Sequence, residues 1–291
     1  MKLTMSGEVF SHAISLKEAL RITKEFGIQN FELWPKNCSS DSADVHPMLY
    51  RNRDVATAGM LLQNNAIRLA CVAFGGAFFP EVTANANDYV EELIRAIEVA
   101  AKLGAPYVNH YCCNIAPQFE LDFSILDRYY SRPLRRAEEL GVTLVLENEA
   151  HDMTHTPENA LAIINHFQSS NFRLNLDATN FYQGGNEAFP YAYDLLKDVI
   201  GYVHIKNGCI YQPEHNHSEG WKGGKMSGHL AGHYIYYTPP TKGAVNIFGL
   251  LDKLKENNYS GFVTLEPHST FENVMTYYHD AIPMLREAGY F

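Results

Sequence analysis

Short apolar segments alternate with longer amphipathic segments from one end of this sequence to the other. The short segments have the length and the β-branched and aromatic content of strands, whereas apolar residues recur at helical spacing in the longer ones, for example over 87–104. Eight such pairs follow one another, which is the number that closes a parallel barrel inside a ring of helices. The pattern therefore predicts an α/β fold, a single (β/α)8 TIM barrel over residues 1–291. The expected strands are 2–5, 30–34, 67–74, 106–111, 142–147, 172–177, 201–206 and 262–266.

Several helix boundaries can be predicted from single residues. Ser15 can cap the helix that follows the first strand, and Gly27 can end it. Further along, Thr156 stands at an N-cap position with Pro157 at the first helical position. Such short connections predict right-handed crossovers around one continuous core, so we expect one domain.

Composition narrows the class of protein. The 291 residues are 46% hydrophobic and 12% aromatic, as in an ordinary globular chain. A formal charge of −10 opposes binding to nucleic acid or to an anionic membrane surface. No apolar run is long enough to span a bilayer, and the N-terminal segment is too polar for a signal peptide. The five cysteines lack disulfide or zinc-finger spacing, so we expect reduced thiols and a cytoplasmic protein.

Residues 207–244 interrupt the alternation after the seventh strand. This segment is rich in Gly, His and Tyr and has no clear period. Long loops inside compact domains usually serve function, and this one follows a strand on the face where barrels of this kind place their active sites. We therefore expect an irregular insertion that acts as a lid over the site.

Metal-binding side chains stand at the C-terminal ends of four successive expected strands. In a parallel barrel these ends lie side by side around one rim, so the four side chains converge. Three carboxylates this close would repel one another unless a cation lies among them. Together with one imidazole they suit Mn²⁺, Mg²⁺, Co²⁺ or Zn²⁺. The sequence therefore predicts that one divalent metal is bound by Glu147, Asp177, His204 and Glu266.

Strand alternation adds candidates at the same rim. His268 shares the inward side of its strand with Glu266. His110, which ends the fourth strand, is expected to face the rim and to contact substrate hydroxyls. Glu32 and Trp34 end the second strand and are expected to line the pocket, with Trp34 as an apolar platform for a sugar.

Nearly the whole chain resembles the xylose-isomerase-like barrel superfamily, in particular its sugar phosphate isomerase/epimerase branch with the ketose 3-epimerases. The resemblance lies in the motifs "LVLEN", "LNLDATNF", "YVHIKN" and "NYSGFVTLE". It implies that the four residues named above bind one metal and that Glu147 and Glu266 also act as the acid/base pair. It implies a homodimer or homotetramer as well.

Three positions depart from the pattern of that branch, one of them Asn207 in "HIKN", where the branch more often has "HxKD". Asn180 stands where the ketose epimerases carry a substrate-binding histidine, and Ile210 falls near the position of an arginine. We expect Asn180 to bind substrate in place of the histidine, and the substrate to differ from a simple ketohexose.

The mechanism expected from these residues is proton transfer next to a carbonyl of a sugar or sugar derivative. One of Glu147 and Glu266 would remove the proton, giving a cis-enediolate, and the other would return it on the opposite face. Return to the same carbon is epimerisation, and return to the neighbouring carbon is isomerisation. Lys206, inward-facing on the seventh strand, could stabilise the enediolate, orient a carboxylate, or serve only as a structural ion pair.

Three other functions fit the same scaffold. A dehydratase of a keto-inositol or dehydroshikimate would begin with the same proton removal and then expel a hydroxyl group. An apurinic endonuclease would need more His and Asp ligands. The acidic charge of this chain would also repel its DNA substrate. A non-catalytic sugar sensor would have no need for both Glu147 and Glu266.

Overall fold

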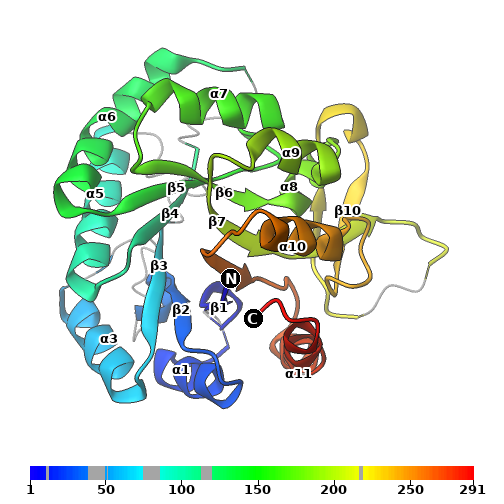
Figure 1. Ribbon diagram of the computed structural model, residues 1–291, viewed down its shortest axis with the longest axis horizontal. Helices are drawn as coiled ribbons and strands as arrows, with labels where there is room; N and C mark the ends of the chain where they lie inside the picture. The colour runs from blue at the N-terminus through cyan, green and yellow to red at the C-terminus, as the bar shows by residue number, and fades with distance from the viewer. Residues whose placement is uncertain (11–12, 39–49, 51, 75–85, 113–119, 216–218) are drawn as a thin grey trace.

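A computed structural model describes residues 1–10, 13–38, 50, 52–74, 86–112, 120–215 and 219–291. Eight parallel strands form a closed barrel in the order β1-β11-β7-β6-β5-β4-β3-β2, and helices surround it (Figure 1). This confirms the predicted single TIM barrel. The barrel strands are β1 Lys2–Ser6, β2 Asn30–Leu33, β3 Arg68–Phe74, β4 Tyr107–Tyr111, β5 Thr143–Glu147, β6 Phe172–Asp177, β7 Ile200–Ile205 and β11 Phe262–Leu265.

The helices start and end where their sequences provide caps. Ser15 accepts a hydrogen bond from the N–H of Glu18, and Thr156 accepts one from that of Asn159, so both predicted N-caps are confirmed. Gly27 takes a left-handed backbone conformation just after the first helix, as predicted for its end. No helix of the described residues is both long and apolar enough to cross a bilayer. The helices are α1 Leu16–Glu25, α2 Pro35–Cys38, α3 Asn52–Asn65, α5 Ala86–Leu103, α6 Phe123–Leu140, α7 Pro157–Phe167, α8 Ala178–Gln183, α9 Tyr193–Leu196, α10 Ile247–Glu256 and α11 Phe271–Glu287.

Most of the hydrophobic core lies between the barrel wall and the helices. Strand residues such as Leu144, Leu146 and Leu174 are fully buried in this layer. Each buried side chain of this size contributes about 1.5–3 kcal/mol relative to the exposed state. Alternate residues of the same strands point into the barrel, where a separate small cluster contains Val145 and Tyr202. The interior above that cluster is therefore left for polar side chains.

Strand register sets these polar side chains at one level. Tyr111 of β4 pairs with Glu147 of β5, and Asp177 of β6 pairs with His204 of β7. His204 also pairs with Thr264, two residues before Glu266. The C-terminal ends of β4 to β7 and β11 therefore meet at one rim, as the fold requires.

The segment 207–244 is not wholly irregular, which corrects part of the expectation for it. It contains a three-stranded antiparallel sheet in the order β8-β10-β9, formed by β8 Asn207–Ile210, β10 Tyr234–Thr238 and β9 Gly223–Lys225. Strands of three to five residues, one of them rich in glycine, are too short to show a period in the sequence. Residues 216–218 of the segment lie outside the described part of the chain.

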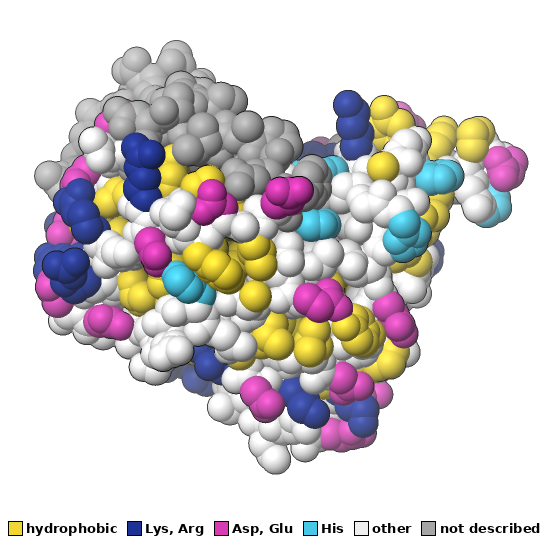
Figure 2. All heavy atoms as spheres, turned by 90° about the horizontal axis from the view of Figure 1, so that it is seen from above, with side chains coloured by type: hydrophobic (Ala, Val, Ile, Leu, Met, Phe, Trp, Pro, Cys, Tyr) yellow, Lys and Arg dark blue, Asp and Glu magenta, His cyan; other side chains and the backbone are white. Residues whose placement is uncertain are grey.

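The insertion stands out from the barrel in the view of Figure 2, with histidine and apolar side chains on its surface. Its inner side is attached to the rim. The amide of Gln183, at the end of α8, donates to the carbonyl of Lys225 at 2.7 Å, and the Ser227 hydroxyl donates to the carbonyl of Ala150. These bonds place the end of β9 next to α8 and next to the segment that follows β5.

Candidate active site at the C-terminal rim of the barrel

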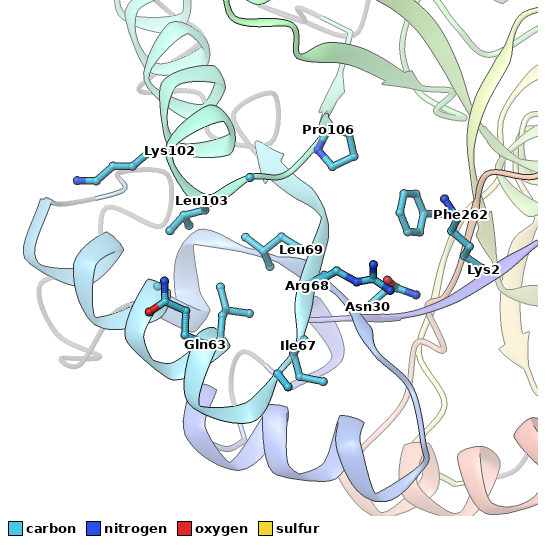
Figure 3. Close-up of a pocket in the computed structure, with 14 residues that line it drawn as sticks. Lys2, Asn30, Gln63, Ile67, Arg68, Leu69, Lys102, Leu103, Pro106 and Phe262 are labelled. Atoms are coloured by element: carbon cyan, nitrogen blue, oxygen red, sulfur yellow. The ribbon is translucent and has the colours of Figure 1, made fainter.

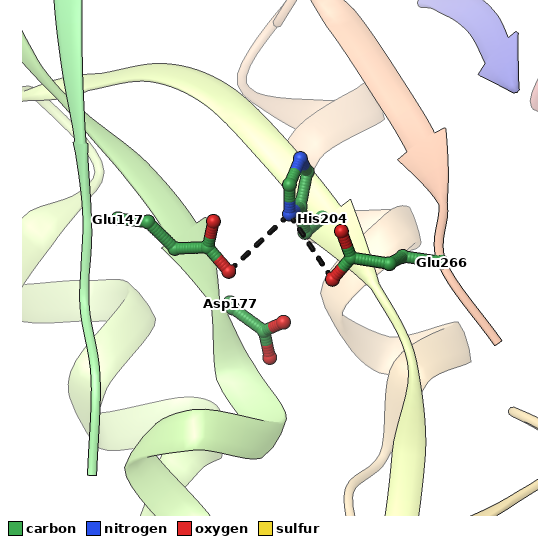
Figure 4. Close-up of side chains that lie close together, drawn as sticks. All are labelled: Glu147, Asp177, His204 and Glu266. Atoms are coloured by element: carbon green, nitrogen blue, oxygen red, sulfur yellow. Dashed lines mark ion pairs between the residues drawn. The ribbon is translucent and has the colours of Figure 1, made fainter. Parts of the chain in front are cut away.

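The four predicted metal ligands lie together at the C-terminal rim. Each offers one ligand atom, these atoms lie within 4.8 Å of one another, and all four residues are buried. In Figure 4 the carboxylates of Glu147 and Glu266 approach His204 from opposite sides, and Asp177 lies below them. The strands deliver these side chains from four neighbouring positions of the barrel wall.

The imidazole of His204 is held by a carboxylate behind it. Its Nε2 lies 2.9 Å from Oε2 of Glu32, whereas its Nδ1 lies 3.3 Å from Oε1 of Glu147 and 3.3 Å from Oε2 of Glu266. Nδ1 is buried and makes no hydrogen bond among the described residues. A carboxylate that accepts the N–H of one ring nitrogen leaves the lone pair of the other nitrogen available to a metal.

Glu32 therefore does not line the pocket, which corrects its expected substrate role. Its carboxylate is fully buried and accepts hydrogen bonds from Trp34 Nε1 at 2.9 Å and from the Ser6 hydroxyl at 3.3 Å. Trp34 itself is only 8% exposed and packs against Ala73 and Tyr111. The indole N–H of Trp34 thus holds the Glu32 carboxylate, and the role of its ring as a sugar platform stays a prediction.

Lys206 supplies positive charge to the cluster. Its Nζ lies 3.0 Å from Oδ2 of Asp177 and 3.6 Å from Oε2 of Glu266. Burial alone would lower the pKa of Lys206, but these carboxylates outweigh it and raise the pKa well above its ordinary value. Burial would likewise raise the pKa of Glu266, yet His204 and Lys206 hold it well below the ordinary value. Lys206 thus lies among the cluster carboxylates and not below the site.

Three asparagine amides surround Glu147. Asn109 Nδ2 donates to Oε2 of Glu147 at 2.7 Å and Asn175 Nδ2 donates to Asn109 Oδ1 at 3.0 Å, while Asn180 Nδ2 lies 3.5 Å from Oε1 of Glu147. Asn180 also donates to Oε1 of Glu149 at 3.2 Å. Burial raises the pKa of Glu147, and His204 partly opposes this. Such a carboxyl group is oriented for proton transfer.

The expectation that His110 faces the rim was wrong. Its ring centroid lies 5.1 Å from that of Tyr130 on α6 and 5.6 Å from that of Phe172, so it points into the layer between strands and helices. Burial there lowers the pKa of His110 to about 3. Tyr111 of the same strand lies level with Glu147 and faces inward with it. Since residues two apart in a strand share a face, Asn109 also faces inward and His110 faces outward.

A second set of ionisable groups lies beside Glu266. Nε2 of His268 is 3.6 Å from Oε2 of Glu266 and 4.0 Å from Oε2 of Glu8, and the three residues offer ligand atoms within 4.8 Å of one another. Partial burial, followed by repulsion from Glu266, raises the pKa of Glu8 to about 8. The inward direction of His268 was predicted from strand alternation. Glu8 was missed, although it follows the C-terminal end of β1 and so stands at the same rim.

The residues present fit a divalent cation. Three carboxylates and one imidazole form a donor set suited to Mn²⁺, Co²⁺, Zn²⁺ or Mg²⁺. The buried Nδ1 atom of His204 has no hydrogen-bond partner among the described residues, although buried polar atoms almost always have one. A cation bound to Nδ1 would supply the missing interaction.

A large cavity of the described residues lies elsewhere. It has a volume of about 680 Å³ and sits at the N-terminal ends of the strands, where Lys2, Asn30, Arg68 and Phe262 line it (Figure 3). The chemistry-bearing side chains are at the other end of the barrel. We therefore assign the candidate active site to the C-terminal rim, as in other barrels of this kind.

Comparison with known proteins agrees with this fold. Residues 20–288 match the family model described as the xylose isomerase-like TIM barrel. Among curated proteins, none matches this chain. Solved structures resemble it over nearly their whole length, at 15–19% identity.

Three of these structures illustrate the range of proteins that share this fold. The probable 3-DHS dehydratase AsbF of Bacillus anthracis has a TM-score of 0.71 at 15% identity and covers 98% of this chain and 99% of its own. The 3-keto-D-glucoside 4-epimerase YcjR of E. coli has a TM-score of 0.69 at 17% identity, with 99% of each chain covered. The IOLI protein, solved with a bound zinc atom, has a TM-score of 0.69 at 19% identity and covers 99% of this chain and 96% of its own.

Proposed function

Because this chain belongs to the xylose isomerase-like TIM-barrel family, we propose that it is a divalent-metal-dependent isomerase or epimerase of a sugar or sugar derivative. One observation carries the proposal. The carboxylates of Glu147 and Glu266 lie on opposite sides of His204 Nδ1, each at 3.3 Å (Figure 4). A substrate held between them would have one carboxyl group on each face, which is what proton removal and return require.

Glu147, Asp177, His204 and Glu266 would hold the cation. When bound, it supplies stabilisation of the negative charge that develops on the substrate oxygens. We assign Mn²⁺, Mg²⁺, Co²⁺ or Zn²⁺ on the donor set, and the zinc bound by the structurally similar IOLI protein agrees with that range.

The protein's own residues would divide the chemistry as follows. One of Glu147 and Glu266 removes the proton α to the substrate carbonyl, and the other returns a proton to the resulting cis-enediolate. Asn109 and Asn180 orient Glu147 through their amides. Lys206, 3.0 Å from Asp177, offsets part of the negative charge and offers a cation to an enediolate oxygen.

Dehydration is the second candidate reaction. It starts with the same proton transfer, and a structurally similar protein is described as a probable 3-DHS dehydratase. The products separate the two reactions, since only a dehydratase forms an unsaturated carbonyl compound. That compound absorbs in the ultraviolet and is seen directly in a product assay.

Uptake of deuterium from heavy water tests the proposal. The protein supplied with Mn²⁺ is incubated with ketoses, aldoses, keto-inositols and 3-dehydroshikimate, and exchange at the α-carbon is followed by proton NMR. We expect exchange with at least one of them, and a loss of about 10²–10⁴-fold in Glu147→Gln and Glu266→Gln.

Glu256→Gln is the matched control, because Glu256 is exposed and pairs with Lys253 on the outer helix α10. Wild-type exchange rates in either rim variant would contradict the two-base scheme. Tight sugar binding without any exchange would indicate a sensor instead of an enzyme.

A further inference from the structure

We propose that Glu8, Glu266 and His268 bind a second divalent cation, next to the first and bridged to it by Glu266. The ligand atoms of the three residues lie within 4.8 Å of one another. Nε2 of His268 is 3.6 Å from Oε2 of Glu266 and 4.0 Å from Oε2 of Glu8. Metal–ligand distances of about 2.0–2.2 Å place the ligand atoms of one ion about 3–4.4 Å apart, so these separations suit a shared ion.

Unpartnered buried atoms point to a ligand at this position. Nε2 of His268 is buried and has no hydrogen-bond partner among the described residues, and the same holds for Oε1 of Glu266. The Glu266 side chain is only 1% exposed. Buried polar atoms are almost always paired, because an unpaired one costs about 1–3 kcal/mol. A cation accepts lone pairs from both atoms at once.

The ring of His268 is held in the orientation that this site needs. Its centroid lies 4.9 Å from that of Tyr237 on β10, and the Tyr237 hydroxyl donates to Oε1 of Gln183 at 2.9 Å. The backbone of His268 is fixed as well, since its carbonyl accepts the N–H of Lys222 at 3.1 Å. Both Tyr237 and Lys222 belong to the insertion, so the insertion stabilises the second site.

The donor set favours a transition-metal ion. Imidazole with two carboxylates suits Mn²⁺, Co²⁺ or Zn²⁺ better than Mg²⁺ or Ca²⁺, which prefer oxygen ligands. The second ion would bind more weakly than the first, because Lys206 Nζ lies 3.6 Å from the shared Glu266 oxygen and the first ion also repels it. Glu8 is 38% exposed, which leaves a route from solvent.

Metal stoichiometry tests the inference without any substrate. Purified metal-free protein is titrated with MnCl₂ or CoCl₂ by isothermal titration calorimetry, and the metal content after gel filtration is measured by mass spectrometry. We expect two equivalents in the wild type, the second of lower affinity, and spin coupling between two Mn²⁺ ions by electron paramagnetic resonance. His268→Phe, which keeps the stacking on Tyr237, and Glu8→Gln should each bind one equivalent.

Two controls separate this inference from the proposed function. His151→Phe removes a rim histidine outside the cluster, bonded to the carbonyl of Lys225, and should keep two equivalents. Asp177→Asn weakens the first site alone. One equivalent in the wild type, unchanged in His268→Phe, would overturn the second site and leave the first intact. Two equivalents retained in both His268→Phe and Glu8→Gln would overturn it too, whereas no binding in the wild type would overturn both sites.

Discussion

Nε2 of His204 lies 2.9 Å from Oε2 of Glu32 across the barrel, and both side chains are fully buried. The two residues are 172 positions apart in the sequence and come from β7 and β2. Glu32 also accepts the indole N–H of Trp34, so one carboxylate connects a tryptophan to the candidate metal ligand. When His204 is neutral, this contact favours the tautomer with its proton on Nε2, which leaves the lone pair of Nδ1 directed at Glu147 and Glu266.

Glu32→Gln should therefore weaken cation binding. An amide that replaces the carboxylate no longer supports the basicity of His204, and such changes typically cost about 10–100-fold in metal affinity. Calorimetric titration of the metal-free variant with MnCl₂ measures this loss of affinity. Trp34→Phe, which keeps the ring but loses its N–H, should show a smaller loss. Unchanged affinity in Glu32→Gln would show that the contact is only structural.

Removing the cation should destabilise the fold. A ligand that binds only the native state raises the free energy of unfolding by about 2.7 kcal/mol when present at 100 times its dissociation constant. We expect MnCl₂ to raise the melting temperature of the wild type and excess EDTA to reverse it. Asp177→Asn should show a smaller Mn²⁺-induced rise in melting temperature than the wild type, and a full Mn²⁺ response in this variant would contradict the assigned site.

The sequence predicts the barrel and the meeting of the four candidate ligands for one physical reason. Parallel strands of a closed barrel end at one rim, so an acidic or histidine residue at each strand end must lie near the others. Glu147, Asp177, His204 and Glu266 are therefore brought together by topology alone. No knowledge of side-chain packing is needed for this step.

The positions that sequence reasoning misplaced depend on packing between distant strands. "YVNHY" offers two adjacent polar residues, and only the register with β5 decides that Asn109 faces inward while His110 lies level with the outward Leu146. Glu32 was placed at the rim correctly, but its contact with His204 spans the barrel interior and leaves no local pattern. Register and cross-barrel distances come only from the assembled structure.

Lys206→Met should destabilise the metal-free protein more than the metal-bound protein. Without a cation, Lys206 compensates the carboxylates of Asp177 and Glu266, and removing one partner of a buried pair costs about 3–5 kcal/mol. In Lys206→Met, bound Mn²⁺ would neutralise the two carboxylates in place of the ammonium group. The ammonium group would also no longer repel the ion, so we expect the affinity for Mn²⁺ to rise. Urea unfolding with EDTA or MnCl₂ measures both effects. Lys225→Met, an exposed lysine of the insertion, is the control, and equal losses under both conditions would contradict the prediction.

His110 should make the protein less stable in mild acid. Burial lowers the pKa of His110 to about 3, whereas an unfolded histidine titrates near 6.5. Between these values the unfolded state binds one proton more than the native state, so this group lowers the free energy of unfolding as the pH falls. The slope approaches about 1.4 kcal/mol per pH unit, which integrates to about 1.6 kcal/mol between pH 6.5 and pH 5.

His110→Phe should remove that dependence, because phenylalanine fills the same space against Tyr130 and Phe172 and does not titrate. Urea unfolding between pH 7 and pH 5, with EDTA present so that cation binding does not contribute, gives the difference between variant and wild type. We expect the stability of the variant relative to the wild type to rise by about 2 kcal/mol on going from pH 7 to pH 5. Since His110 touches none of the candidate ligands, Mn²⁺ affinity at pH 7 should stay unchanged. If the stabilities of variant and wild type changed in parallel with pH, His110 would take up its proton in the native state as it does in the unfolded state. A loss of Mn²⁺ affinity in the variant would show that His110 acts at the rim after all.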